Sequence, residues 1–302
     1  MSEDVAGIGP EFEDLKHRGL QAIEAGRLEE AGELFDRALE LAREQGDPRL
    51  IDLAFCNRAA VTVVLGQGER ELPQLREILV RNADPVSCRL AAYNIARHYE
   101  LTKNYKKALF YARIARERAE QQGRQEWIAS SHNLMGNIFL AESFIDEACS
   151  AFETALELMP VESPIWRARI LDNLGYCRVL KGAYREGYEL LYESLAVLRR
   201  HKAERYQIST CLDLCFAHLE TGRYGHARRQ GETALRLAEA LGETDSIKNA
   251  LYLLGEAASL NGDIDTAREH FTRLQRDFFP DASYLTGFLL AVDVRKLINL
   301  HA

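Results

Sequence analysis

The sequence has 302 residues, 47% of them apolar, and a formal net charge of −8, values ordinary for a protein with a substantial core. No apolar run reaches 18 residues, so no membrane-spanning helix is predicted. The acidic N-terminus lacks the apolar region of a secretory signal. The six cysteines are scattered through helical sequence, as small buried hydrophobes would be, rather than as a disulfide framework. We therefore expect a cytoplasmic protein.

The acidity is concentrated at the start of the chain. Residues 1–50 contain 13 acidic and 6 basic residues, whereas residues 89–124 contain 9 basic and 3 acidic residues. We expect residues 1–10 to be a disordered acidic N-terminus.

From residue 11 to residue 280, one spacing of small and large apolar residues recurs. Its clearest copy has Gly136, then Ala148 twelve residues on, Phe152 four beyond that, and Ala155. Copies of differing strength start at Gly19, Ala59, Ala96, Gly136, Gly175, Cys215 and Gly255, with gaps of 40, 37, 40, 39, 40 and 40 residues. A glycine stands seven residues after the start in five of the seven copies.

Each part of this pattern has a physical cause. Apolar residues at i, i+3, i+4 and i+7 around each start indicate an amphipathic helix. The glycine seven residues on can take the positive φ that ends a helix, and a second helix then begins. Small residues at the start and twelve residues on permit the two helices to pack closely. The pattern therefore predicts seven antiparallel helix pairs.

These residues resemble the tetratricopeptide repeat family over roughly residues 11–280. The family's positions are occupied in one copy by Leu174–Gly175, Gly182, Tyr184 and Gly187, and in another by Leu254–Gly255, Gly262, Ala267, Phe271 and Pro280. The period of about 40 residues is similar to that of the family's longer class, seen in kinesin light chains, polarity adaptors and bacterial peptide-sensing regulators. The resemblance implies an all-α fold, a right-handed superhelical solenoid that is one cooperative unit.

Residues 281–302 follow the last pair. Their apolar residues cover most of a helix circumference, so we expect a C-terminal helix that caps the stack. The alternative is a homodimer formed through the outer side of this helix.

The sequence contains no known catalytic motif: it has no Gly-rich phosphate loop, no HExxH pair and no nucleophile elbow. Cys211, Cys215 and His218 share one helical face and could hold zinc. Cys215 is itself a repeat start, however, which favours buried packing. We therefore predict that the protein is not an enzyme and uses no cofactor or metal.

A ladder of polar residues is the strongest candidate for a functional site. In the resembled family the first helices of successive pairs line a concave groove, and polar residues one turn before the repeat start hold an extended peptide. That turn carries Asn57, Asn94, Asn133, Asn173 and Asp213. An amide offers both a donor and an acceptor, which suits a peptide backbone. The same face carries Lys16, Tyr93, Arg97, Asn137, Arg169, Tyr176, Phe216, Tyr252 and Glu256.

Three functions remain open at this point. The ladder favours a non-enzymatic scaffold or adaptor that binds a protein partner or peptide, unless the asparagines only bond one repeat to the next. An alternative is a regulatory peptide sensor that acts through a partner. A third is a nucleic-acid binder that uses the basic residues 89–124, although the pI near 5.6 argues against it.

Overall fold

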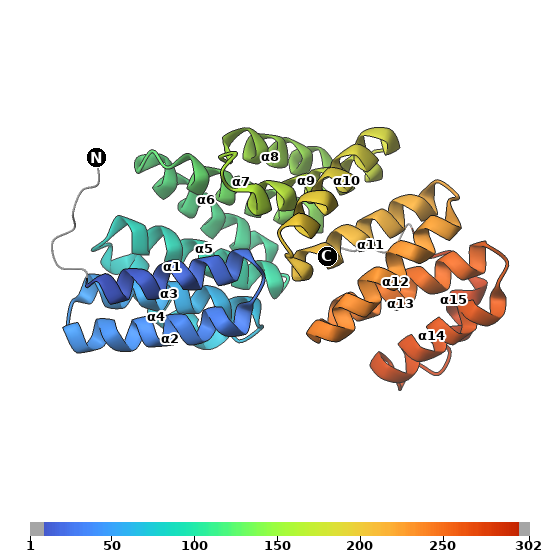
Figure 1. Ribbon diagram of the computed structural model, residues 1–302, viewed down its shortest axis with the longest axis horizontal. Helices are drawn as coiled ribbons and strands as arrows, with labels where there is room; N and C mark the ends of the chain where they lie inside the picture. Colours follow the sequence, from blue (N-terminus) through green and yellow to red (C-terminus); the bar gives the residue numbers. More distant parts are fainter. Residues whose placement is uncertain (1–8, 296–302) are drawn as a thin grey trace. The chain divides into compact units, whose positions relative to one another are not determined.

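The computed structural model describes residues 9–295, and within this range the chain is helical, without a strand (Figure 1). The first helices of the pairs are α1 (Pro10–Glu24), α3 (Pro48–Val64), α5 (Pro85–Leu101), α7 (Gln125–Ala141), α9 (Pro164–Leu180), α11 (Glu204–Glu220) and α13 (Thr244–Leu260). The second helices are α2 (Leu28–Gln45), α4 (Leu72–Arg81), α6 (Tyr105–Gln121), α8 (Ile145–Leu158), α10 (Tyr184–Arg200), α12 (Tyr224–Leu241) and α14 (Ile264–Phe278). A short 3₁₀ helix, η1 (Gly68–Glu71), precedes α4, and α15 (Leu285–Ala291) follows the last pair. The prediction of an all-α fold of seven helix pairs is confirmed.

The turn between the two helices of each pair has the same backbone conformation seven times. The residue at the predicted position has a positive φ in every pair: Gly26, Gly66, Lys103, Ser143, Gly182, Gly222 and Gly262. Lys103 and Ser143 adopt this conformation although they carry side chains, with φ values of 58° and 64°. The turn geometry is thus kept even where glycine, which favours it, is absent.

Proline and aspartate residues mark the start of two first helices, α3 and α5. Pro48 and Pro85 occupy the first turn of α3 and α5, where a missing N–H costs nothing. The side chain of Asp47 accepts a hydrogen bond from the N–H of Arg49, and Asp84 accepts one from Ser87. These caps satisfy backbone donors that have no partner within the helix.

The chain divides into two compact units. The first comprises Met1–Glu142 and Ser150–Ser163, and the second comprises Ser143–Cys149 and Pro164–Ala302. The expectation that residues 11–280 form one cooperative domain stays a prediction.

In both units, an aromatic ring fills the space that a small residue leaves open. In the first unit, a Cβ built on Gly19 or Gly136 would lie 2.5 Å from the ring of Phe35 or Phe152. In the second, the ring of Phe271 lies in the same way against Gly255. Phe35, Phe152 and Phe271 are fully buried. All six cysteines are buried free thiols, as their scattered positions predicted.

The C-terminal helix is shorter than predicted. A helix was expected within residues 281–302, but α15 covers only Leu285–Ala291, and at Val292 the backbone is extended (φ −129°, ψ 124°). Residues 280–284 form turns, so the helix also starts late. The side chain of Gln275 on α14 accepts hydrogen bonds from the N–H and hydroxyl of Thr286, which fixes α15 against the last pair. Residues 1–8 and 296–302 lie outside the described residues, and with them most of the expected disordered N-terminus.

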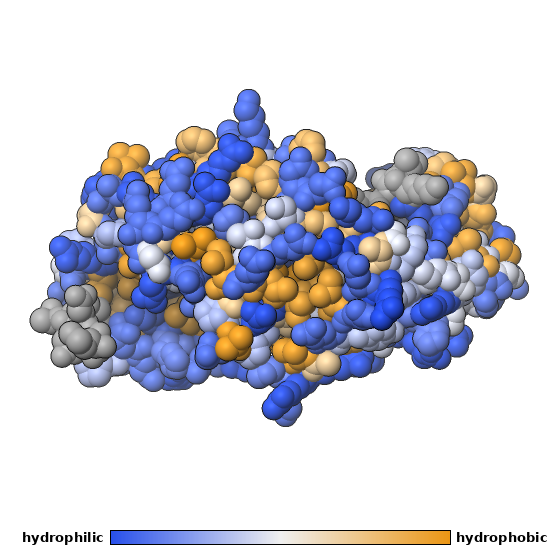
Figure 2. Space-filling model, turned by 90° about the horizontal axis from the view of Figure 1, so that it is seen from above, coloured by the Kyte–Doolittle hydropathy of each residue, from blue (hydrophilic) through white to orange (hydrophobic). Residues whose placement is uncertain are grey.

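The surface mixes polar and apolar residues. On the face drawn in Figure 2, apolar groups lie between stretches of hydrophilic residues. Exposed large side chains include Val80, Phe110 and Tyr284. Between residues 9 and 295, no helix has the length and hydropathy needed to cross a membrane.

Candidate functional site

The five ladder residues lie on consecutive first helices, from α3 to α11, as predicted. Their exposure differs: Asn57, Asn94 and Asp213 are buried, whereas Asn133 and Asn173 are half-buried. A ligand could therefore reach Asn133 and Asn173 more readily than the other three.

Asn94 has a partner within the protein. Its side-chain amide on α5 donates a 2.7 Å hydrogen bond to the main-chain carbonyl of Cys56 on α3, and the residue is 1% exposed. This bond joins the first helices of two successive repeats. For Asn94 the structure thus supports the alternative interpretation of the ladder, packing between repeats, over contact with a peptide.

The other candidates of the first unit are half-buried. Tyr93 packs against the core, and Arg97 forms an ion pair with Glu100 one turn further along α5. Asn137 lies on α7, one turn after Asn133. Tyr93 and Arg97 lie on either side of Asn94 in the sequence of α5. Both are partly exposed, although Asn94 itself is buried.

In the second unit, the candidates on α9 contact the next first helix, α11. The guanidinium of Arg169 lies 4.6 Å from the ring centre of Trp166 and 4.3 Å from that of Tyr206. The rings of Tyr176 and Phe216 have centres 5.7 Å apart and are both buried. These contacts link the two helices, and Arg169 and Tyr206 are half-buried at the surface of this face.

The carboxylate of Asp172 reinforces the same link. It accepts a 2.8 Å hydrogen bond from the hydroxyl of Ser209 on α11. Asp172, Ser209, Trp166 and Tyr206 were not identified as candidates, because none of them repeats at the period that revealed the ladder. Asp172 directly precedes the ladder residue Asn173. Two adjacent polar residues at this turn of the helix could have indicated a polar contact here.

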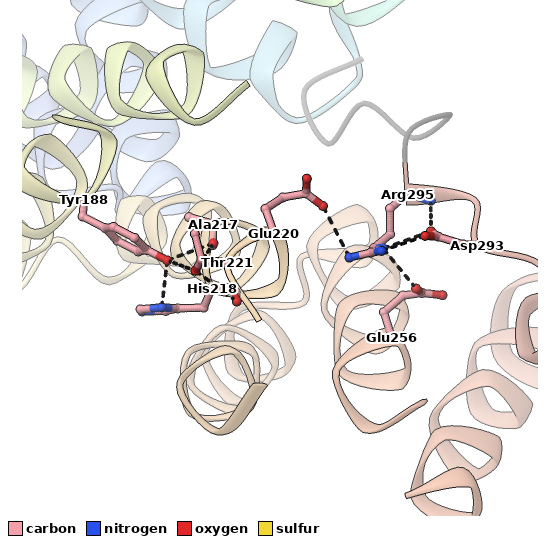
Figure 3. A network of polar contacts seen from close by, with 8 residues as sticks. All are labelled: Tyr188, Ala217, His218, Glu220, Thr221, Glu256, Asp293 and Arg295. Atoms are coloured by element: carbon pink, nitrogen blue, oxygen red, sulfur yellow. Dashed lines mark hydrogen bonds and ion pairs between the residues drawn. The ribbon is translucent and has the colours of Figure 1, made fainter. Parts of the chain in front are cut away.

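The end of the described chain lies against α11 and α13. Arg295 Nη1 lies 3.4 Å from Glu220 Oε1, and Arg295 Nε lies 3.8 Å from Glu256 Oε2 (Figure 3). Asp293 also pairs with Arg295, at 2.7 Å. Burial, together with the charge of Asp293 and against the opposing charge of Arg295, raises the pKa of the Glu256 carboxyl to about 7. Glu256 and Tyr252 were assigned to the groove face, but the contact of Glu256 with the C-terminal segment was not foreseen.

A second cluster lies between α10 and α11. His218 is buried, its Nδ1 lies 3.0 Å from the hydroxyl of Tyr188, and its Nε2 lies 2.9 Å from that of Tyr192. The Tyr188 hydroxyl also lies 2.9 Å from the carbonyl oxygen of Ala217, to which it can donate (Figure 3). Desolvation, assisted by His226, lowers the pKa of His218 to about 4, so the ring is neutral near pH 7.

This cluster borders a shallow hollow of about 410 Å³. The hydroxyl contacts occupy both ring nitrogens of His218, which leaves it no lone pair for zinc beside Cys211 and Cys215. No group of three or more potential metal-ligating side chains occurs among residues 9–295.

The basic segment 89–124 uses several of its cations internally. The guanidinium of Arg89 is buried and lies 4.4 Å from the ring centre of Trp127, and burial lowers its pKa to about 10. Arg116 pairs with Glu120 at 3.2 Å, and Lys107 lies over the ring of Tyr99. These contacts reduce the number of cations available to phosphate groups.

The comparisons with known proteins agree with the fold. Residues 217–287 match the sequence model of the tetratricopeptide repeat family. A sequence comparison with curated proteins gives no match. Over these residues the family predicted from the spacing of small residues is confirmed.

Several solved structures share this fold at low sequence identity. A Rap protein complexed with Competence and Sporulation Factor has 16% identity and a TM-score of 0.67, covering 88% of this chain and 74% of that one. NprR in complex with its cognate peptide NprX has 13% identity and a TM-score of 0.66, covering 94% and 83%. The apo form of the quorum sensor NprR from B. thuringiensis has 16% identity and a TM-score of 0.66, covering 92% and 80%.

Proposed function

We propose that this protein is a non-enzymatic scaffold that binds an extended peptide, or an extended segment of a protein partner, on its first helices. The observation that carries the proposal is the contact of the segment after α15, which leaves the helix at Val292, with α11 and α13. This contact supports the idea that α11 and α13 accept a chain segment that is not an α-helix. One of the proteins that share the fold, NprR, is described as a complex with its cognate peptide, which is consistent with it.

The first helices of each unit carry side chains that suit such a ligand. Asn133 and Asn137 in the first unit and Asn173 in the second are half-buried amides, a group with both a donor and an acceptor for a peptide backbone. Arg169 and Tyr206 offer a flat cationic and aromatic surface, the residue types that dominate binding energy at interfaces. Asn57, Asn94, Asp213, Tyr176, Phe216 and Tyr252 are buried and would support this surface from beneath.

A library of labelled extended peptides, screened by fluorescence anisotropy against the full chain, tests the proposal. For any peptide that binds, Arg169→Ala and Asn173→Ala should each cost about 1–3 kcal/mol of binding free energy. The matched control is Arg228→Ala, an exposed arginine on a second helix. Peptides whose affinity is unchanged by the two substitutions would place binding elsewhere. An activity abolished by one point substitution would overturn the non-enzymatic assignment.

The second candidate function is a regulatory sensor. The same C-terminal segment favours it, because a ligand that binds α11 and α13 could displace this segment. Small-angle scattering with and without a bound peptide separates the two functions. A profile that changes on binding favours the sensor, and an unchanged profile favours a rigid adaptor. For the nucleic-acid alternative, binding that weakens steeply with salt would be the supporting result.

A further inference from the structure

The segment after α15 places one arginine against two first helices. The chain leaves the helix at Val292, buries Val294, and directs the side chain of Arg295 to the carboxylates of Glu220 on α11 and Glu256 on α13 (Figure 3). The Arg295 side chain is 18% exposed, and its guanidinium lies within 4 Å of three carboxylates, counting that of Asp293. Most of a long cationic side chain is therefore removed from water.

The two helices provide the anionic half of this contact. Glu256 is 4% exposed, and a buried carboxylate is costly unless a cation or a proton neutralises it. Asp293 belongs to the C-terminal segment itself and already pairs with Arg295 through its own side chain. Glu220 and Glu256 therefore form a carboxylate seat that a cation stabilises, whichever chain supplies it. A planar guanidinium has five N–H donors and can bind both carboxylates at once, whereas an ammonium group is less suited to this.

A hydroxyl beside the two carboxylates offers a ligand a further hydrogen-bond donor. The hydroxyl of Tyr252, one turn before Glu256 on α13, is buried and has no hydrogen-bond partner among residues 9–295. The residue is 6% exposed, and the charged groups that act on it are Glu256, Asp293, Arg295 and Glu220. The hydroxyl thus lies among the residues of the seat, and the described part of the C-terminal segment, up to Arg295, does not bond to it. A backbone carbonyl of an incoming peptide could accept from it.

We propose that Glu220, Glu256 and Tyr252 form an arginine-binding subsite of the first-helix face, that its external ligand is an arginine-bearing extended peptide, and that Arg295 is its internal competitor. This inference rests on the proposed function, because it names the chemistry of one position of the peptide. Since Arg295 is tethered to the site, its effective concentration there is of the order of millimolar. An external peptide must therefore outcompete it through additional contacts along the face.

The test uses the full chain and acetyl-Val-Asp-Val-Arg-amide, the sequence of residues 292–295, as the probe. Saturation-transfer NMR detects binding even in the millimolar range, so weak binding is still measured. We expect Arg295→Ala to bind the probe roughly tenfold more tightly than the unmodified chain, because the seat is vacated. The same probe with glutamine in place of arginine should not bind Arg295→Ala. Adding Glu220→Gln and Glu256→Gln to Arg295→Ala should remove binding, whereas adding Glu232→Gln, an exposed carboxylate on α12, should not.

Equal binding to the unmodified chain and to Arg295→Ala, or equal binding of the arginine and glutamine probes, would overturn the inference. Circular dichroism verifies that each variant is folded, and the double variant Arg295→Ala, Glu256→Gln provides the same comparison if the triple variant is not. The outcomes also separate the two proposals. If the peptides of the library bind the first-helix face but are indifferent to arginine and to Arg295→Ala, the proposed function stands and the arginine subsite fails. If the probe binds Arg295→Ala while no library peptide binds, the subsite stands and the wider groove function fails.

Discussion

The ring of Phe152 on α8 occupies the space where Gly136 on α7 would carry a Cβ: that atom would lie 2.5 Å from Cε1 of the ring. Contacts this short do not occur, so any larger residue at this position must displace a fully buried phenylalanine.

Gly136→Ala should therefore destabilise the protein by about 1–3 kcal/mol, the usual cost of overpacking a core. The measurement is the free energy of unfolding in denaturant. Gly225→Ala is the matched control, because Gly225 is helical and a Cβ there meets nothing within 4 Å. The explanation fails if both substitutions have the same effect. Leucine is smaller than phenylalanine, so the double variant Gly136→Ala, Phe152→Leu should recover part of the stability that Gly136→Ala loses.

Asn94→Ala should lower stability rather than affinity. The substitution removes the hydrogen bond to the Cys56 carbonyl, and bonds of this kind contribute about 0.5–1.5 kcal/mol. Asn261→Ala, at an exposed asparagine just after α13, should change stability by less than about 0.5 kcal/mol. Thermal melts and peptide anisotropy on the same samples distinguish the two roles. A loss of affinity with an unchanged melting temperature would return Asn94 to the binding surface.

His218 should make stability depend on pH in the acidic range. Its pKa is lowered from an ordinary 6.5 to about 4, so between these values the unfolded chain binds a proton that the folded chain does not. Stability should therefore fall as the pH drops from about 6.5 to 4. His218→Gln should remove this component, while His17→Gln, at an exposed histidine on α1, should not. Identical pH profiles for His218→Gln and the unmodified chain would contradict this role for His218.

Glu256 should contribute a slope of the opposite sign. Burial raises its pKa from 4.5 to about 7, so the folded chain holds a proton that the unfolded chain has released. This contribution is complete below about pH 4.5 and is lost as the pH rises through 7. Glu256→Gln should thus flatten the fall in melting temperature between those values, measured relative to the unmodified chain. A steeper fall in the variant would show that the carboxyl is not buried as a proton-binding group.

Lys103→Gly should stabilise the protein, in contrast to most substitutions. Lys103 has a φ of 58°, a conformation that costs a residue with a side chain about 1–2 kcal/mol. Glycine avoids that cost but adds about 0.5–1 kcal/mol of unfolded-state entropy, so a net gain of up to about 1 kcal/mol is expected. Gly182→Ala makes the converse change at the equivalent turn and should destabilise. If both substitutions destabilise, the Lys103 side chain contributes contacts that outweigh its backbone strain.

The sequence was sufficient to predict the helix pairs because close packing and positive φ restrict residue choice at fixed positions. Gly136, Phe152 and Gly182 are examples in which few other side chains would fit. The direction of a polar side chain is less restricted: whether Asn94 faces a ligand or Cys56 depends on the neighbouring helix. The contact of Arg295 with Glu220 joins residues 75 positions apart and follows no repeat, so periodicity could not reveal it.

The recurring turn also restricts how such a chain can change in length. Gly182, Gly222 and Gly262 have positive φ at equivalent points, 40 residues apart, each followed by a second helix. Removing residues 183–222 would join Gly182 to Arg223, the residue that already follows this kind of turn at the start of α12. The new junction would have the same backbone conformation on both sides as the old ones. Insertions and deletions within the repeats are therefore expected to be tolerated in whole periods, so that the length of the protein evolves in steps of one helix pair.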